Sequence, residues 1–277
     1  MISGMTEVMG IVNVTPDSFS DGGLYLDPEK AISHGLELID EGADLLDLGG
    51  ESTRPGADPV APEEELGQVI PVVEHLAGRA RVSIDTGKAV VAEAAIGAGA
   101  TMVNDVTALR GDPEMARVCV EGGVEVVLMH MLGEPRTMQD DPRYGDVVEE
   151  VLEFLLERAR FAEQAGISRE KIWIDPGIGF GKTAEHNFAL LAATDRFVAT
   201  GYRVLVGPSR KRFIGSVDGS GESERVGGTV AACLAAARKG AAAVRVHDVA
   251  PVFQAFAIEG EIATAEAGGT DPGPASG

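Results

Sequence analysis

The feature that most constrains the fold is an alternation, repeated eight times, of a short run rich in branched apolar residues and a longer stretch with helical periodicity. The short runs are Val8–Val14, Leu45–Leu48, Val82–Asp85, Met102–Asn104, Val124–Met129, Ile172–Asp175, Val204–Val206 and Val244–Val246. The helical stretches are Pro28–Glu41, Pro62–Leu76, Ala89–Ala98, Pro113–Glu121, Asp146–Ala165, Glu185–Ala193, Glu222–Lys239 and Val249–Ile262. Strict alternation predicts parallel strands joined by right-handed crossovers.

Two architectures satisfy this pattern, a doubly wound open sheet and a closed barrel. Continuous apolar runs such as VEVVLM predict strands that are buried on both faces in either case. Eight units in 277 residues favour a single-domain (β/α)₈ TIM barrel, because such barrels take about 250 residues. We expect this domain over residues 1–262. Residues 263–277 are rich in Gly, Pro and Ala without periodicity, which predicts a disordered tail.

The charge balance excludes several classes of partner. The 23 Lys and Arg against 44 Asp and Glu give a net charge of −21, so nucleic acid and anionic membrane surfaces are disfavoured. No apolar run approaches the roughly 20 residues of a membrane span, and the first ten residues lack the pattern of a secretory signal. We therefore expect a cytoplasmic protein, in which Cys119 and Cys233 are small buried apolar residues without a metal or redox role.

Polar residues stand at the predicted ends of almost every strand, where a barrel builds its site. Asp85, Asn104 and Asp175 end three different strands. A carboxylate accepts two parallel hydrogen bonds, so converging carboxylates suit a ligand with a row of N–H donors. A 2-amino-pyrimidinone ring has such an edge.

A basic set is predicted opposite these acceptors, and it consists of Arg54, Arg210, Lys211, Arg245 and His247. The alternative for the short run Arg210, Lys211 and Arg212 is simple solvation at the surface. In so acidic a chain, this set is the best candidate for a phosphate or carboxylate site, and a buried Arg245 needs an anionic partner. Asn13 and the aspartates of the following loop, VTPDSFSDGG, supply the hard oxygen ligands that Mg²⁺ on a diphosphate prefers. This loop is either a flexible turn or a mobile lid.

The run PGIGFGKT resembles two nucleotide-binding motifs but matches neither of them. Pro176 stands where a Walker A loop needs glycine, and the glycine spacing does not match GxGxxG. We expect the glycines to let the backbone pass close to a flat ligand. Lys182 is expected outside the site, solvated or paired with a carboxylate, and His130 is either structural or a ligand contact. No HExxH motif or paired histidine spacing indicates zinc.

Together these motifs resemble the dihydropteroate synthase family. The resemblance rests on MGIVNVTPDSFSDGG, DLGGESTRPG, VSIDT, VNDV, LMHM, DPGIGFGK, GPSRKRFIG and VRVHDV, which run in the family's order from Met9 to about Ile262. It implies a pterin-binding (β/α)₈ barrel, a homodimer and the joining of 4-aminobenzoate to a dihydropterin methyl diphosphate. In this family diphosphate leaves first, and the arylamine then attacks a pterin-methyl cation. Mg²⁺ is the implied cofactor.

The resemblance also implies roles for residues at matching positions. It makes Asp85, Asp21, Lys211 and Arg245 the catalytic residues. Asp175 would take the 2-amino and N3 protons of the pterin, with Asp85 and Asn104 beside it and Lys211 on the O4 and N5 side. The remaining substrate-binding residues would be Thr53, Arg54, Phe19 and Ser209 on the 4-aminobenzoate side, Phe180 and Met129, and Arg245 and His247, which with the metal ligand Asn13 hold the diphosphate.

One departure from the family and two competing functions stay open at this point. Pro208 stands in GPSRK where many relatives carry another small or flexible residue, and it stiffens the turn before Ser209. A pterin-binding methyltransferase barrel would keep the Asp and Asn set but would not need the ESTRPG and SRK elements. A non-catalytic pterin-binding paralogue would not need intact loop residues.

Overall fold

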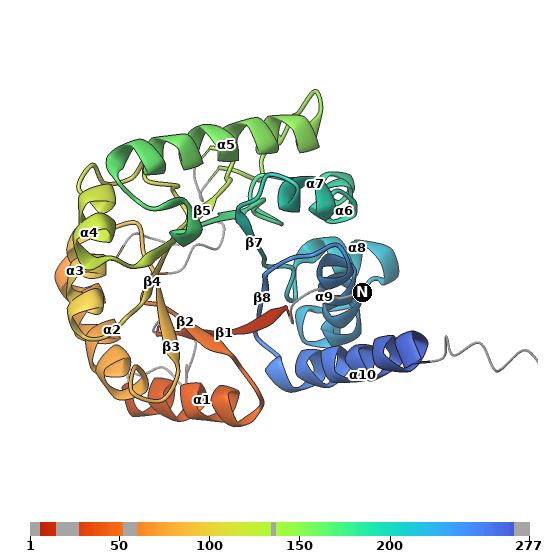
Figure 1. Ribbon diagram of the computed structural model, residues 1–277, viewed down its shortest axis with the longest axis horizontal. Coiled ribbons are helices and arrows are strands. Elements are labelled where there is room, and N and C mark those ends of the chain that lie inside the picture. Colours follow the sequence, from red (N-terminus) through yellow and green to blue (C-terminus); the bar gives the residue numbers. More distant parts are fainter. Residues whose placement is uncertain (1–5, 15–27, 52–59, 134–136, 269–277) are drawn as a thin grey trace, which may run out of the picture.

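The computed structural model describes residues 6–14, 28–51, 60–133 and 137–268. Its strands pair in parallel and in sequence order, and β1 also pairs with β8, so the sheet closes into a barrel (Figure 1). The strands are β1 Glu7–Asn13, β2 Leu45–Gly49, β3 Arg81–Asp85, β4 Met102–Asp105, β5 Glu125–Met129, β6 Ile172–Asp175, β7 Arg203–Val206 and β8 Ala243–Val246. The predicted (β/α)₈ barrel is confirmed, and the open sheet is ruled out.

Helices surround the barrel as an outer ring (Figure 1). They are α1 Pro28–Asp40, α2 Pro62–Leu76, α3 Ala89–Gly97, α4 Met115–Gly122, α5 Val147–Ala165, α6 Ala184–Ala192, α7 Thr194–Val198, α8 Arg212–Asp218, α9 Val226–Arg238 and α10 Val249–Gly268. Short 3₁₀ turns lie at Arg169–Lys171 and Glu222–Glu224.

The last helix is longer than the sequence pattern predicts. We expected it to end at Ile262, but α10 continues to Gly268. Alanine and glutamate are strong helix formers and follow Ile262 in the run ATAEA, which continues the helix. The prediction of a disordered tail is therefore wrong for residues 263–268, and residues 269–277 lie outside the described part of the chain.

Side chains alternate between two cores along each strand. The barrel interior is filled by Met9, Leu45, Met102, Val127, Trp173, Leu205 and Ala243. Their neighbours point outward against the helices, as Leu46 and Ile174 do toward the larger cluster that includes Val73 of α2 and Leu155 of α5. Because both faces of the sheet are apolar and buried, the strands are fixed in register and their carboxyl ends meet at one face.

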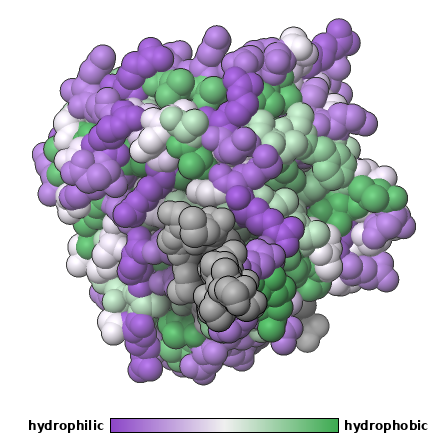
Figure 2. Space-filling model, turned by 45° about the vertical axis from the view of Figure 1, so that its right-hand side comes forward, coloured by the Kyte–Doolittle hydropathy of each residue, from purple (hydrophilic) through white to green (hydrophobic). Residues whose placement is uncertain are grey.

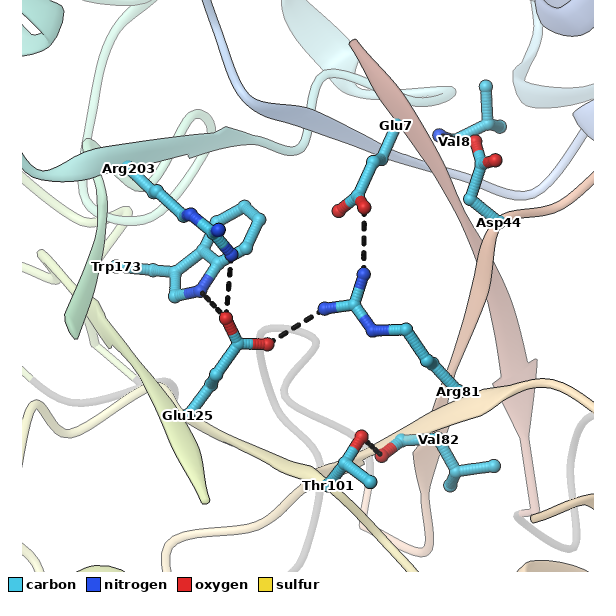
Figure 3. Close-up of polar contacts among 9 residues, drawn as sticks. All are labelled: Glu7, Val8, Asp44, Arg81, Val82, Thr101, Glu125, Trp173 and Arg203. Carbon is cyan, nitrogen blue, oxygen red and sulfur yellow. Dashed lines mark hydrogen bonds and ion pairs between the residues drawn. The ribbon is translucent and has the colours of Figure 1, made fainter. Parts of the chain in front are cut away.

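The opposite, amino-terminal end of the barrel is closed by a charged layer that links five strands (Figure 3). Arg81 pairs with Glu7 and Glu125, each at 2.7 Å. Glu125 also accepts hydrogen bonds from Nε1 of Trp173 at 3.2 Å and from Arg203 at 2.7 Å. We call these residues the barrel floor.

The acidity of the chain lies mainly on the outer helices. Hydrophilic residues cover most of the face drawn in Figure 2, and Glu63, Glu64, Glu149 and Glu153 are exposed on α2 and α5. Glu65 of α2 differs from these residues, because it is fully buried and pairs with Lys88 at 2.5 Å.

Two further expectations concern cysteines and membranes. Cys119 and Cys233 are free and buried, and burial raises the pKa of Cys119 to about 12, as expected of inert core thiols. Within the described ranges, no helix is both long and apolar enough to cross a membrane.

Candidate active site

The carboxyl-terminal ends of the strands surround a cavity of about 420 Å³, open space at its mouth included. Ile11, Val106 and Gly207 form part of its wall. The predicted site residues that line it are Asp85, Asn104, Met129, Asp175, Phe180, Ser209, Lys211, Arg245 and His247. Parallel strands in a closed barrel end at one face, and this brings together residues that are far apart in sequence.

Arg245 on β8 is held between two carboxylates inside the barrel. Its Nε donates a hydrogen bond to Oδ2 of Asp47 at 2.5 Å, and its Nη2 donates to Oδ2 of Asp85 at 2.7 Å. The same Oδ2 of Asp47 accepts a hydrogen bond from Nδ2 of Asn104 at 3.0 Å. The expectation that Arg245 has an anionic partner is confirmed.

Asp85 is poised between its two protonation states. Burial raises the pKa of Asp85 to about 7; the charge of Arg245 opposes this shift, and the negative charge of Asp47 adds to it. Near neutral pH the carboxyl is therefore divided between a neutral form that can donate a proton and an ionised form that only accepts hydrogen bonds.

Asp175 ends β6 and is fixed by the loop that follows it. Its Oδ1 accepts a hydrogen bond from the backbone N–H of Gly177 at 2.7 Å, and burial raises its pKa although Gly177 and Lys211 oppose the shift. Gly177 has φ +66°, and a Cβ there would lie 1.9 Å from the carbonyl oxygen of His130. Glycine is thus required where this loop crosses the β5 end.

Lys211 reaches across the same loop. Its Nζ donates a hydrogen bond to the carbonyl oxygen of Ile178 and lies 4.2 Å from the centre of the Phe180 ring. Burial lowers the pKa of Lys211 to about 7, against the nearby negative charges of Asp175 and Asp85. Lys211 therefore carries a proton that it can give up near neutral pH.

Ser209 and His247 form the far side of the cavity. The hydroxyl oxygen of Ser209 accepts a hydrogen bond from the backbone N–H of His247 at 3.1 Å and lies 3.0 Å from its Nδ1. Arg210 does not join them, because its guanidinium pairs with Asp248 through contacts of 2.8 and 2.5 Å. The prediction that Arg210 belongs to the basic set of the mouth is wrong.

Comparison with known proteins agrees with this geometry. Residues 9–247 match the family described as pterin binding enzyme. A dihydropteroate synthase of Escherichia coli K12 is 47% identical over 253 residues, which are 91% of this chain and 89% of the relative. The chain belongs to the dihydropteroate synthase family.

Two solved structures of the family are similar throughout the chain. The Xanthomonas albilineans dihydropteroate synthase with 4-aminobenzoic acid is 50% identical, has a TM-score of 0.88 and is matched over 95% of this chain and 94% of its own. The same enzyme in complex with 7,8-dihydropteroate is 47% identical with a TM-score of 0.85, over 95% of each chain. The fold and the enzymatic class of the family therefore apply to this chain.

Several residues that the family resemblance implies are not placed in the cavity. Thr53, Arg54, Phe19 and Asp21 lie outside the described residues. Asn13 ends β1 and is half-buried, and it is not among the residues that line the cavity. In the part of the chain that the structure describes, no three His, Cys, Asp or Glu side chains gather as a metal site requires.

Sequence reasoning placed Lys182 outside the site, and Lys182 is not among the residues that line the cavity, but its expected surroundings were wrong; His130 was left undecided. Lys182 is buried, and its Nζ lies 3.0 Å from Nδ1 of His130 and donates to the carbonyl oxygen of Phe180 at 2.9 Å. It is therefore not solvated, and no carboxylate of the described residues forms an ion pair with it. Burial and the charge of Lys182 lower the pKa of His130 to about 3, so His130 is a neutral structural residue that holds the β5 and β6 loops together.

Asp47 was missed altogether. It stands inside the strand LLDLG and is fully buried. One feature of the sequence could have indicated it: Asp47 is a carboxylate within an apolar strand, and this strand leads directly into GGESTRPG.

Proposed function

We propose that this chain joins 4-aminobenzoate to (7,8-dihydropterin-6-yl)methyl diphosphate and releases 7,8-dihydropteroate and diphosphate, a step of folate biosynthesis. The observation that carries the proposal is the set of three acceptors, Asp85, Asn104 and Asp175, in one cavity with Lys211 and Arg245. A pterin ring presents several N–H donors on one edge and carbonyl and ring-nitrogen acceptors on the other. The cavity offers the complementary groups.

The pterin lies against Asp175 in this proposal. The Oδ1 of Asp175 is held by Gly177, so its other oxygen and the nearby acceptors receive the 2-amino and N3 protons. Lys211 donates toward O4 and N5 from the opposite side. Met129 and Phe180 bound the flat ring by apolar contact.

The diphosphate lies toward Arg245, His247 and Asn13. Arg245 presents a guanidinium that stays charged at any working pH, and an Arg fork matches phosphate oxygens. Mg²⁺ would arrive with the diphosphate, with Asn13 as one oxygen ligand, and would neutralise charge on the leaving group. Ser209, with Thr53, Arg54 and Phe19, forms the 4-aminobenzoate side.

The reaction begins with breakage of the bond between the pterin methylene carbon and the diphosphate oxygen, which keeps the electron pair. Arg245 stabilises the departing anion, and the ionised carboxylates of Asp85 and Asp21 face the positive charge left on the pterin methylene. The amino nitrogen of 4-aminobenzoate then forms the new C–N bond and loses a proton. No side chain forms a covalent intermediate.

The decisive experiment mixes the purified protein with Mg²⁺, the dihydropterin diphosphate and 4-aminobenzoate, and follows diphosphate release and dihydropteroate formation. Both products are expected in equal amounts. Tight binding of a methylated folate with no diphosphate release would instead identify a methyltransferase barrel. Pterin binding without turnover would identify a non-catalytic paralogue.

Two substitutions test the division of the cavity into subsites. Asp175→Ala removes the acceptor of the N–H edge and should weaken pterin binding by about 1–3 kcal/mol, measured by calorimetry. Arg54→Ala should instead weaken the use of 4-aminobenzoate and leave pterin binding intact. Equal loss of both substrates in either variant contradicts the division.

We further propose that the protein is a cytoplasmic homodimer. Two free buried thiols suit a reducing compartment. Phe188 on α6 packs edge-on against Phe213 of α8 with ring centres 5.3 Å apart, and both Phe188 and Val217 of α8 are exposed. Exposed apolar residues on two packed helices, here Phe188 and Val217, are typical of a subunit interface. Light scattering should give twice the chain mass, and Phe188→Glu should halve it.

A further inference from the structure

We infer that Asp47, which makes no contact with substrate in the proposed function, is the residue that positions both Asn104 and Arg245 for binding the pterin diphosphate. The inference rests on the proposed function and concerns the layer beneath the cavity. Among the described residues that line the cavity are the two partners of Asp47, but not Asp47 itself. Any effect of Asp47 on binding therefore passes through those partners.

One oxygen of Asp47 does the positioning. Oδ2 accepts from Nε of Arg245 at 2.5 Å and from Nδ2 of Asn104 at 3.0 Å. The first contact fixes the orientation of the guanidinium, because Nε faces Asp47 while Nη2 reaches Asp85. The second contact decides the orientation of the amide, because Nδ2 of Asn104 is turned toward Asp47 through one of its two N–H groups and the amide oxygen then lies on the other side.

The orientation of Asn104 matters because of the other groups in the cavity. Asp85 and Asp175 are acceptors when they are ionised, and an amide turned the other way would place a donor beside them. With Asp47 in place, the described wall presents three acceptors to one edge of the ligand. If a donor of the protein faced a donor of the ligand, both would be buried without a partner, and binding would lose the full desolvation free energy of these groups.

Asp47 is also retained at a cost to stability. Its side chain is fully buried, and among the described residues no donor lies within hydrogen-bonding distance of Oδ1. A buried carboxylate with one unsatisfied oxygen is unfavourable compared with an apolar residue in the same strand. A role in positioning accounts for a charged group inside a barrel whose interior is filled by apolar side chains such as Met9, Leu45 and Met102.

The test exchanges the donor and the acceptor of the Asp47–Asn104 pair. Asn104→Asp keeps an acceptor toward the ligand but sets two carboxylates against each other, and Asp47→Asn loses the anchor of Arg245. The double variant, Asp47→Asn with Asn104→Asp, restores one hydrogen bond with reversed direction. Calorimetry with 7,8-dihydropteroate should show at least about a tenfold loss of affinity for Asn104→Asp. The double variant should recover a substantial part of that loss.

A second readout does not depend on affinity. Asp85 faces Arg245, Asp47, Glu65 and Asp105, and the charge of Asp47 contributes to the raised pKa of Asp85. Arg245 lowers that pKa by more than Asp47 raises it, so in Asp47→Asn the loss of the Arg245 anchor should move the midpoint of the Asp85 carboxyl titration by ¹³C NMR to higher pH. A midpoint that moves to lower pH would show loss of the Asp47 charge alone, with Arg245 still beside Asp85, and would contradict the positioning role.

Ser83 provides a matched control. It lies opposite Asp47 in the β2–β3 register, is fully buried and has a hydroxyl oxygen without a partner among the described residues. Ser83→Ala should leave the affinity for 7,8-dihydropteroate within twofold of the wild type.

The inference is overturned if Asp47→Asn binds 7,8-dihydropteroate as the wild type does, or if the double variant is no better than Asn104→Asp. Should Asp47→Asn fail to fold, two variants that keep Asp47 are compared instead. Asn104→Asp must then bind 7,8-dihydropteroate more weakly than Asn104→Ala does. Failure of the proposed function looks different, since the wild type itself then binds no dihydropteroate and forms none.

Discussion

At the scale of single residues, the cavity holds an acid and a base that burial drives toward their neutral forms. The pKa of Asp85 is raised to about 7 and that of Lys211 is lowered to about 7. A bound pterin diphosphate offers donors to the first and acceptors to the second. Binding therefore favours the charged form of each group. In the ligand-free protein, the burial of these two groups lowers the free energy of unfolding.

This cost predicts a pH dependence of stability for the ligand-free protein. Asp85 has a folded pKa above its ordinary 3.8, so the folded state binds the extra proton and stability falls as pH rises from about 4 to about 7. Lys211 has a folded pKa below its ordinary 10.5, so its contribution is lost as pH falls from about 10.5 to about 7. Thermal unfolding of Asp85→Asn should show a flatter profile between pH 4 and 7 than the wild type. An unchanged slope contradicts the raised pKa.

The residues that end strands were predictable, and those inside strands were not. Asp85, Asn104 and Asp175 stand where apolar runs stop, and parallel topology then places them at one face. Asp47 interrupts a run, and only its contacts to Asn104 and Arg245 explain it. The pairing of Lys182 with His130 depends on a crossing of two loops that no local pattern encodes.

At the scale of elements, the loop between β6 and α6 is the most tightly determined part of the site. Gly177 and Gly181 both have positive φ, and added Cβ atoms would strike His130 and Leu132 of the β5 loop. The interior strands and long helices followed from periodicity, whereas α7 and α8 were missed because they are short. Helix α4 starts at Met115 rather than at Pro113, although the Asp112 side chain accepts a hydrogen bond from the backbone N–H of Glu114 as an N-cap residue does.

Gly177→Ala should disrupt this loop. The left-handed backbone and the clash with the His130 carbonyl should together cost at least about 2 kcal/mol of unfolding free energy, measured by denaturant titration. Pterin affinity should fall too, since the Gly177 N–H fixes Asp175. Gly67→Ala is the control: it lies in α2 with no atom within 4 Å of the added Cβ, and it should be neutral or stabilising by about 0.5–1 kcal/mol. Equal effects of the two changes would refute the argument.

At the scale of the whole molecule, the two ends of the barrel divide stability from function. The barrel floor joins β1, β3, β5, β6 and β7 through Glu7, Arg81, Glu125, Trp173 and Arg203 (Figure 3). The cavity lies at the other end, behind an apolar layer. A substitution in the barrel floor should therefore change stability without changing the chemistry of the cavity.

Arg81→Met tests this division. It leaves Glu7 and Glu125 without their shared cation, and the unfolding free energy should fall by about 1–2 kcal/mol, a modest figure because the pairs are partly solvated. The rate of dihydropteroate formation at 25 °C should stay within twofold of the wild type. A large loss of turnover in a folded variant would mean that the floor and the cavity are coupled.

The acidic coat on the outer helices also bears on how fast substrate is captured. Both substrates are anions, and a chain of net charge −21 repels them at long range. Arg245 and Lys211 attract only at close range, inside the cavity. At 0.1 M salt the screening length is about 10 Å, which weakens the distant repulsion more than the near attraction. Association rates measured by stopped flow should therefore rise with moderate salt, the reverse of an enzyme whose whole surface steers its substrate inward.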